Sequence, residues 1–192
     1  MRGVVLTTSD EGVLPLLSFT MPAVRRSVKS TPSAQNRAMA AALDLRSGPW
    51  SVDEVRAHLQ STVIPLRLAS AGRYPLVQSL WFVLDDDALW CATQEDSVLA
   101  RRLRRDARCG WEVAADAPPY RGVRGTGQAS LERAAAADVL PRLIDRYLGD
   151  TESPLGTWLM SRIDSEVAIR IDGLAVTSWD YTPRMRPEVT DG

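Results

Sequence analysis

The apolar and polar positions between residues 76 and 131 predict the central, β-rich part of the chain. Two apolar runs, residues 76–84 and 88–93, are separated by three consecutive aspartates, which signals a hairpin. Two more strands are expected at residues 109–115 and 121–131. The segment between these two strands contains adjacent prolines, which cannot donate to a ladder and therefore separate them.

The strand at residues 121–131 alternates between two kinds of side chain. Polar residues occupy the even positions, while small or apolar residues occupy the odd positions. One face of this strand is therefore expected to pack, and the other to meet solvent or a ligand. Three glycines, Gly122, Gly125 and Gly127, indicate that something approaches the backbone closely. A ligand, a neighbouring helix and a bend where a barrel closes are all open as explanations.

Helical spacing is found inside this central part and on both sides of it. In residues 96–105, Leu99 and Leu103 lie four apart and four arginines occupy the other sides of the helix. A capping box formed by Ser51 and Glu54 predicts a helix that ends near residue 60. The remaining expected elements are a first strand at residues 62–69, helices at 140–148 and 154–163, and a closing hairpin of strands 166–171 and 175–181 across Asp172-Gly173.

The chain is expected to hold one domain, residues 46–192, after an N-terminal tail, residues 1–45. Ser, Thr, Pro, Gln and basic residues are scattered through residues 1–38. Residues 13–19 form a short apolar run that contains a proline and follows two acidic residues, whereas a signal peptide has basic residues before a longer apolar core. A short helix that packs on the domain is the alternative to a poorly ordered tail.

Composition narrows the classes of partner. The chain has 23 lysines and arginines against 24 acidic residues, so its net charge of −1 favours neither nucleic acid nor a membrane surface. No apolar run approaches the ~20 residues of a membrane-spanning helix. Cys91 and Cys109 both fall in expected strands and are interpreted as buried, reduced residues, with a disulfide between neighbouring strands as the alternative. A cytoplasmic location is the default expectation.

The sequence lacks the side chains that several kinds of catalysis require. Lys29 is the only lysine, so the domain has no candidate for a Schiff base to a pyridoxal cofactor. His58 is the only histidine, which excludes a paired-imidazole metal site and leaves serine or cysteine hydrolase chemistry hard to assemble. His58 is interpreted as an ordinary residue at the edge of a helix, with a haem ligand as the alternative. Any difficult reaction would therefore depend on a cofactor.

Five sequence segments carry a resemblance to a known family. They are "GRYPLVQSLWF" at residues 72–82, "LWCATQEDS" at 89–97, "ARRLRRDAR" at 100–108, "PPYRGVRGTG" at 118–127 and "SWDYTPRM" at 178–185. In this order the segments resemble the pyridoxamine 5'-phosphate oxidase-like split-barrel flavoproteins, and more closely their actinobacterial and archaeal members, which belong to the flavin/deazaflavin oxidoreductase superfamily. The resemblance covers about residues 64–185.

The resemblance implies a mainly β fold, a six-stranded split β-barrel of the FMN-binding type with flanking helices. It also implies a homodimer with two cofactor sites at its interface. The expected activity is that of an oxidoreductase, which transfers hydride between bound FMN, or alternatively a deazaflavin coenzyme, and an unidentified small organic substrate. A non-catalytic flavin- or haem-binding carrier or sensor is the alternative. No side chain is a convincing proton donor, so no catalytic acid or base is named.

Residues at the start of the 96–105 helix are expected to bind the cofactor phosphate. Thr93 and Ser97 supply hydroxyl groups there, and Arg101 lies one helical turn beyond Ser97. The alternative is that Asp96 or Ser97 only caps the helix. By the resemblance, the backbone of Ser79, Leu80 and Trp81 faces the flavin ring, and Trp179 reaches the cofactor, commonly from the partner subunit.

The sequence departs from the family at its cationic positions. Val77 and Phe82 replace an arginine and a lysine of the oxidase, so this chain is not expected to oxidise pyridoxamine phosphate. Val98-Leu99 replaces an Arg-Lys pair that binds phosphate. Affinity for the phosphate must then come from other arginines, and the candidates are Arg67, Arg101, Arg121 and Arg124. Arg67, Arg121 and Arg124 form either a basic groove for a longer deazaflavin tail or a solvated strand face.

Overall fold

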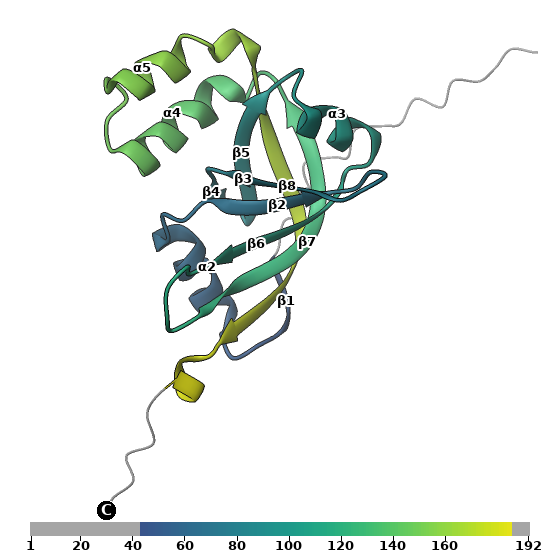
Figure 1. The fold of residues 1–192 in the computed structure, drawn as a ribbon, viewed down its shortest axis with the longest axis vertical. Helices are drawn as coiled ribbons and strands as arrows, with labels where there is room; N and C mark the ends of the chain where they lie inside the picture. The colour runs from purple at the N-terminus through teal and green to yellow at the C-terminus, as the bar shows by residue number, and fades with distance from the viewer. Residues whose placement is uncertain (1–42, 186–192) are drawn as a thin grey trace, which may run out of the picture. The chain divides into compact units, whose positions relative to one another are not determined.

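The structure is a computed structural model that describes residues 43–185. The described part contains one eight-stranded sheet in the order β3-β2-β6-β7-β8-β5-β4, and β1 joins it in parallel beside β8 (Figure 1). All other strand pairs are antiparallel. The strands are β1 (Asp44–Ser47), β2 (Leu66–Ser70), β3 (Leu76–Leu80), β4 (Val83–Asp85), β5 (Ala88–Gln94), β6 (Arg108–Ala114), β7 (Arg121–Glu132) and β8 (Glu166–Asp180).

The predicted split β-barrel with flanking helices is confirmed, but the predicted number of six strands is wrong. The apolar run at residues 76–84 is divided between β3 and β4, because the chain leaves the ladder at Trp81 and Phe82. The short strand β1 was not predicted either. It begins at Asp44, inside the range assigned to the tail, whereas residues 1–42 lie outside the described residues.

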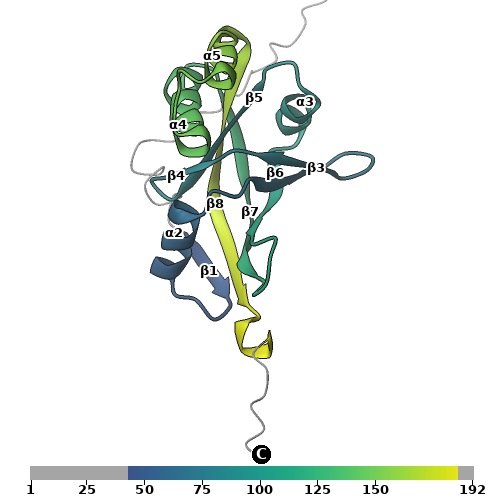
Figure 2. The ribbon, with the colours of Figure 1, turned by 60° about the vertical axis from the view of Figure 1, so that its left-hand side comes forward.

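Four α-helices in residues 43–185 flank the sheet, and α3 and α4 lie on opposite sides of β5 in both views (Figure 1, Figure 2). The predicted capping box is confirmed, since the Ser51 hydroxyl accepts from the Glu54 amide and the Glu54 carboxylate accepts from the Ser51 amide. None of the helices in residues 43–185 is long and apolar enough to cross a membrane. The helices are α2 (Val52–Ser61), α3 (Val98–Arg105), α4 (Ala136–Leu148) and α5 (Pro154–Met160), followed by the short 3-10 helices Ile163–Ser165 and Thr182–Met185.

The predicted closing hairpin is wrong, because β8 continues through Asp172-Gly173 as a single strand of 15 residues (Figure 2). Both halves of β8 pair with the long strand β7, and the register shifts between Thr126 and Gln128. Gly173 has a φ of 61° and lies at this irregularity. A β-bulge and a tight turn both favour a glycine with positive φ, so the same dipeptide satisfies either structure.

The predicted alternation along β7 is confirmed. Val123, Gly127 and Ala129 are buried, whereas the polar residues at even positions are exposed. The buried side chains belong to a core formed with α2 and α3, which includes Leu59, Leu99 and many inward-facing strand residues. The other face of the sheet around β6 and β7 is left open to solvent.

The two cysteines and the single histidine pack against other parts of the protein. Cys91 and Cys109 are buried and not bridged, as predicted, and burial raises the pKa of both thiols. The His58 ring lies against Trp50, with 4.9 Å between ring centroids. Its Nε2 lies 3.4 Å from the carbonyl oxygen of Val113, and burial lowers the pKa of the imidazole. These contacts agree with an ordinary residue at the edge of a helix.

Candidate functional site

Polar side chains form one row across five strands on the outward face of the sheet. The strand register aligns Ser79 of β3 with Arg67 of β2, and Arg67 with Glu112 of β6. Glu112 is in turn aligned with Arg124 of β7, and Arg124 with Thr177 of β8. Residues directly opposite each other in neighbouring strands point to the same face. The structure therefore brings three predicted site residues, Arg67, Ser79 and Arg124, onto one surface.

The two arginines of this row have different environments. Arg67 forms ion pairs with Glu112, at 3.4 Å, and with Asp116. Arg124 instead stacks over Trp179, with its guanidinium carbon 5.6 Å from the ring centroid. Arg124 of β7 and Trp179 of β8, which were predicted separately as cofactor-binding residues, therefore contact each other. Arg67 is already neutralised by carboxylates, so Arg124 is the cation of the row that is available to a ligand.

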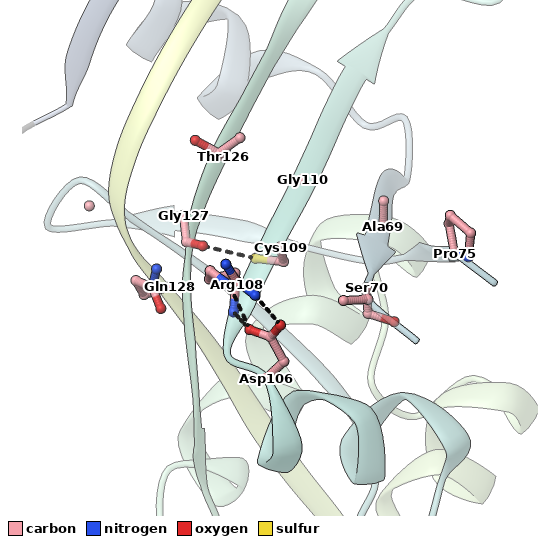
Figure 3. A pocket seen from close by; sticks show the side chains of 12 residues that line it. Ala69, Ser70, Pro75, Asp106, Arg108, Cys109, Gly110, Thr126, Gly127 and Gln128 are labelled. Atoms are coloured by element: carbon pink, nitrogen blue, oxygen red, sulfur yellow. Dashed lines mark hydrogen bonds and ion pairs between the residues drawn. The ribbon is translucent and has the colours of Figure 1, made fainter. Parts of the chain in front are cut away.

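A pocket of about 550 Å³ lies beside this row on the outward face (Figure 3). The register places Ala69, Gly110 and Thr126 side by side in its floor. The ion pair between Arg108 and Asp106, at 2.7 Å, lines another part of the pocket (Figure 3). Small floor residues leave the backbone of β2, β6 and β7 accessible, as the close approach of a flat group requires.

The start of α3 holds the two predicted hydroxyl groups. The Thr93 hydroxyl donates to the Ser97 hydroxyl at 3.2 Å, and the Ser97 oxygen also accepts from the Ala100 amide at 3.0 Å. Ser97 is therefore the N-cap of α3, as the alternative interpretation expected. The Ser97 oxygen accepts both of these bonds, so the Ser97 hydroxyl hydrogen is the one left to donate to an incoming anion.

Arg101 lies in a second pocket, of about 760 Å³, next to the start of α3. Its guanidinium donates to the carbonyl oxygen of Asp96. Arg104 and Arg133, from α3 and the segment before α4, both form ion pairs with Glu95. The remaining residues that line the pocket are Gln94, Asp96, Arg162, Asp164 and Ser165. Four arginines and three carboxylates thus surround one open space, which we call the arginine pocket.

Glu166 is a carboxyl group beside this pocket that the sequence did not indicate. It is only 7% exposed, at the start of β8, and lies opposite the lining residue Gln94 in the strand register. Burial raises the pKa of its carboxyl group, against the opposing effect of Arg162. Glu166 is therefore the described carboxyl group best suited to hold a proton near the arginine pocket.

The other predicted site residues lie apart from these two pockets. Leu80 is partly buried against the core, and the Trp81 ring stacks on Tyr147 of α4, with centroids 5.1 Å apart. Arg121 is exposed at the start of β7, opposite Asp180. The structure thus groups the predicted residues into an outward sheet face and a helix start. It directs the Trp81 side chain toward α4.

Sequence reasoning missed Glu112 and Thr177 in the polar row, and Arg104, Arg133 and Arg162 in the arginine pocket. The first two alternate with buried neighbours along their strands, so period-two alternation is the signal that could have found them. No comparable signal exists for Arg133 and Arg162. They follow β7 and α5, and only the fold brings these two segments to the start of α3.

No protein-family model and no curated protein matches the sequence. Solved structures are similar in fold. The conserved hypothetical protein Rv2991 of Mycobacterium tuberculosis is 25% identical with a TM-score of 0.62, over 75% of this chain and 93% of its own. An F420 reductase is 20% identical with a TM-score of 0.53, over 67% and 97%. A Listeria innocua protein described as a candidate pyridoxamine 5'-phosphate oxidase is 19% identical with a TM-score of 0.50, over 66% and 95%.

Proposed function

Because this chain has the split-barrel fold of the pyridoxamine 5'-phosphate oxidase-like proteins, we propose that it binds FMN, or alternatively the deazaflavin F420, and acts as an oxidoreductase on a small organic substrate. The observation that carries this proposal is the arginine pocket at the start of α3, whose lining residues 94–96 connect Thr93 to Ser97 in the chain. The similar F420 reductase supports a cofactor of this type. When bound, such a cofactor supplies the hydride chemistry that these side chains lack.

The arginine pocket fits an anionic end of the cofactor. Within residues 43–185, the Arg101 guanidinium donates to a carbonyl oxygen, and the Arg162 guanidinium stacks over Trp158 at 4.9 Å and forms no ion pair within 4 Å, although its charge acts on Glu166. Both guanidinium groups can therefore pair with a phosphate, and the Ser97 hydroxyl, which only accepts from Thr93 and Ala100, can donate its hydrogen to it. The volume of about 760 Å³ falls within the range of ligand pockets. These residues compensate for Val98 and Leu99, the second of which is fully buried.

The outward sheet face is proposed as the interface between the two subunits of a homodimer. Val77 lies on this face, opposite Ala69, and exposes 61% of its surface, an unusual amount for an apolar residue. Trp179 and Arg124 lie on the same face, and both residue types are enriched at the centres of interfaces. A second copy on this face would cover the pocket over Gly110 and exclude water from it.

Sedimentation velocity tests the dimer. We expect a single species of about twice the 21.1 kDa chain mass at micromolar concentration. A Val77→Arg variant would place a charge in the proposed interface and should shift the protein toward the monomer, because an unpaired charge is costly to bury. A clean monomer of the unaltered protein would contradict a cofactor site that two subunits share.

The absorption spectrum of freshly purified protein tests the proposed function. We expect the visible bands of an oxidised flavin or deazaflavin, either at once or after titration with FMN or F420. Bleaching by a reductant and recovery with an electron acceptor over many cycles would identify an enzyme. Binding without turnover would identify a carrier instead. Protein that stays colourless with both cofactors would exclude the proposal.

A further inference from the structure

The short segment between β3 and β4 is held by a side chain of α4 rather than by a neighbouring strand. Trp81 and Phe82 belong to neither strand, so no ladder fixes the end of the segment that follows Leu80. The Phe82 amide instead donates to the hydroxyl oxygen of Tyr147, at 3.4 Å. Tyr147 lies in the last turn of α4, 65 residues further along the chain.

Tyr147 makes two further contacts that determine where this amide lies. Its hydroxyl group donates to the carbonyl oxygen of Ile64 at 3.2 Å, which ties α4 to the segment before β2. Its ring stacks on Trp81, with 5.1 Å between centroids and 7° between planes. One side chain therefore fixes the Trp81 ring, the Phe82 amide and the approach to β2. Burial raises the pKa of the phenol, so the hydroxyl group remains protonated and able to donate near neutral pH.

Arg146, the preceding residue, anchors this end of α4. Its guanidinium donates to the carbonyl oxygens of Leu59, Gln60 and Thr62, at 2.9, 2.6 and 2.6 Å, at the end of α2. The same group lies over the Phe82 ring at 5.2 Å. The position of Tyr147 is thus fixed by contacts to two other elements, which makes it a firm support for Trp81 and Phe82.

We infer that Tyr147 is a positioning residue for the cofactor, acting through the backbone of residues 79–82. This inference rests on the proposed function and on the family resemblance, which implies that the backbone of Ser79 to Trp81 lies along the ring of the bound cofactor. Tyr147 sets the direction of that backbone where the sheet stops supporting it. Its hydroxyl group is already engaged by Phe82 and Ile64, so it acts without touching the cofactor.

The test compares Tyr147→Phe with Tyr74→Phe. The first variant keeps a ring that can stack on Trp81 but removes both hydrogen bonds of the hydroxyl group. The second removes the same group from a residue that is 69% exposed. Amide hydrogen exchange, followed residue by residue by NMR in the protein without added cofactor, should show Phe82 exchanging roughly fivefold faster or more in Tyr147→Phe, and unchanged in Tyr74→Phe.

The second measurement is cofactor binding. The dissociation constant of FMN or F420 should rise roughly three- to tenfold in Tyr147→Phe, with a shifted visible spectrum, and stay constant in Tyr74→Phe. Unchanged exchange at Phe82 would overturn the inference, as would faster exchange spread equally through β7 and β8. Faster exchange at Phe82 with unaltered binding would overturn the link to the cofactor. If the unaltered protein binds neither cofactor, the proposed function fails, while the exchange data still decide whether Tyr147 holds the segment.

Discussion

Replacing Arg101 with alanine is expected to weaken the binding of FMN or F420 by roughly ten- to a hundredfold. A hydrogen bond from a charged group to a bound anion is worth about 1.5–3 kcal/mol, which corresponds to that change in affinity. Arg101 lies in the arginine pocket, and within the described residues its guanidinium donates to a backbone carbonyl oxygen and to no carboxylate. Its charge is therefore free for a phosphate. Isothermal titration calorimetry or fluorescence quenching measures the change.

Two controls make this result specific. Riboflavin lacks the phosphate, so its affinity should hardly depend on Arg101. Arg105 is exposed on the same helix but does not line the arginine pocket, so Arg105→Ala should leave FMN binding unchanged. Equal losses for both variants, or for both ligands, would place the phosphate elsewhere, with Arg124 on the outward sheet face as the next candidate. Neither exposed arginine supports the core, so a change in stability would not explain the result.

The elements that the sequence predicted well are those with local signals. Ser51, Ser97 and Ser153 all cap helices near the expected positions, because a cap needs only its own helix turn. The alternation along β7 was predicted for the same kind of reason, since the strand itself carries the pattern. The wrong elements depended on distant partners. Asp172-Gly173 forms a bulge rather than a turn because β7, about 45 residues earlier, is long enough to pair with both halves of β8.

The candidate site follows the same division. Thr93 and Ser97 were predicted to lie together at the start of the 96–105 helix, and their hydroxyl groups do meet. Arg124 and Trp179 were both expected at the cofactor, but their stacking on each other requires the register of β7 and β8. The arginine pocket could not be predicted as a unit. Arg133 and Arg162 reach the start of α3 through the fold alone, and no spacing in the sequence relates them.

Gly125→Ala is expected to lower the free energy of unfolding by about 2–3 kcal/mol, because overpacking a filled interior forces its neighbours to shift. A Cβ atom on Gly125 would lie 2.5 Å from the carbonyl oxygen of Ala175 and 2.7 Å from the Trp111 ring. Trp111 is buried and the carbonyl belongs to β8, so neither can move cheaply. The sequence left a ligand, a neighbouring helix and a bend of the barrel open as the reason for this glycine. The structure instead places the Trp111 ring and the backbone of β8 beside it. The thermal midpoint should fall by roughly 4–12 °C.

Gly110→Ala is the matched control, because Gly110 lies on the adjacent strand but faces outward. Its nearest neighbours would be 3.8 and 3.9 Å from the new Cβ atom, which is ordinary contact. Alanine in a strand restricts the unfolded chain, so this variant should be neutral or more stable by about 0.5–1 kcal/mol. The two substitutions add the same methyl group, but only Gly125→Ala should lower stability. A similar loss in both would mean that the sheet resists any added side chain, rather than that Trp111 and β8 fill the space beside Gly125.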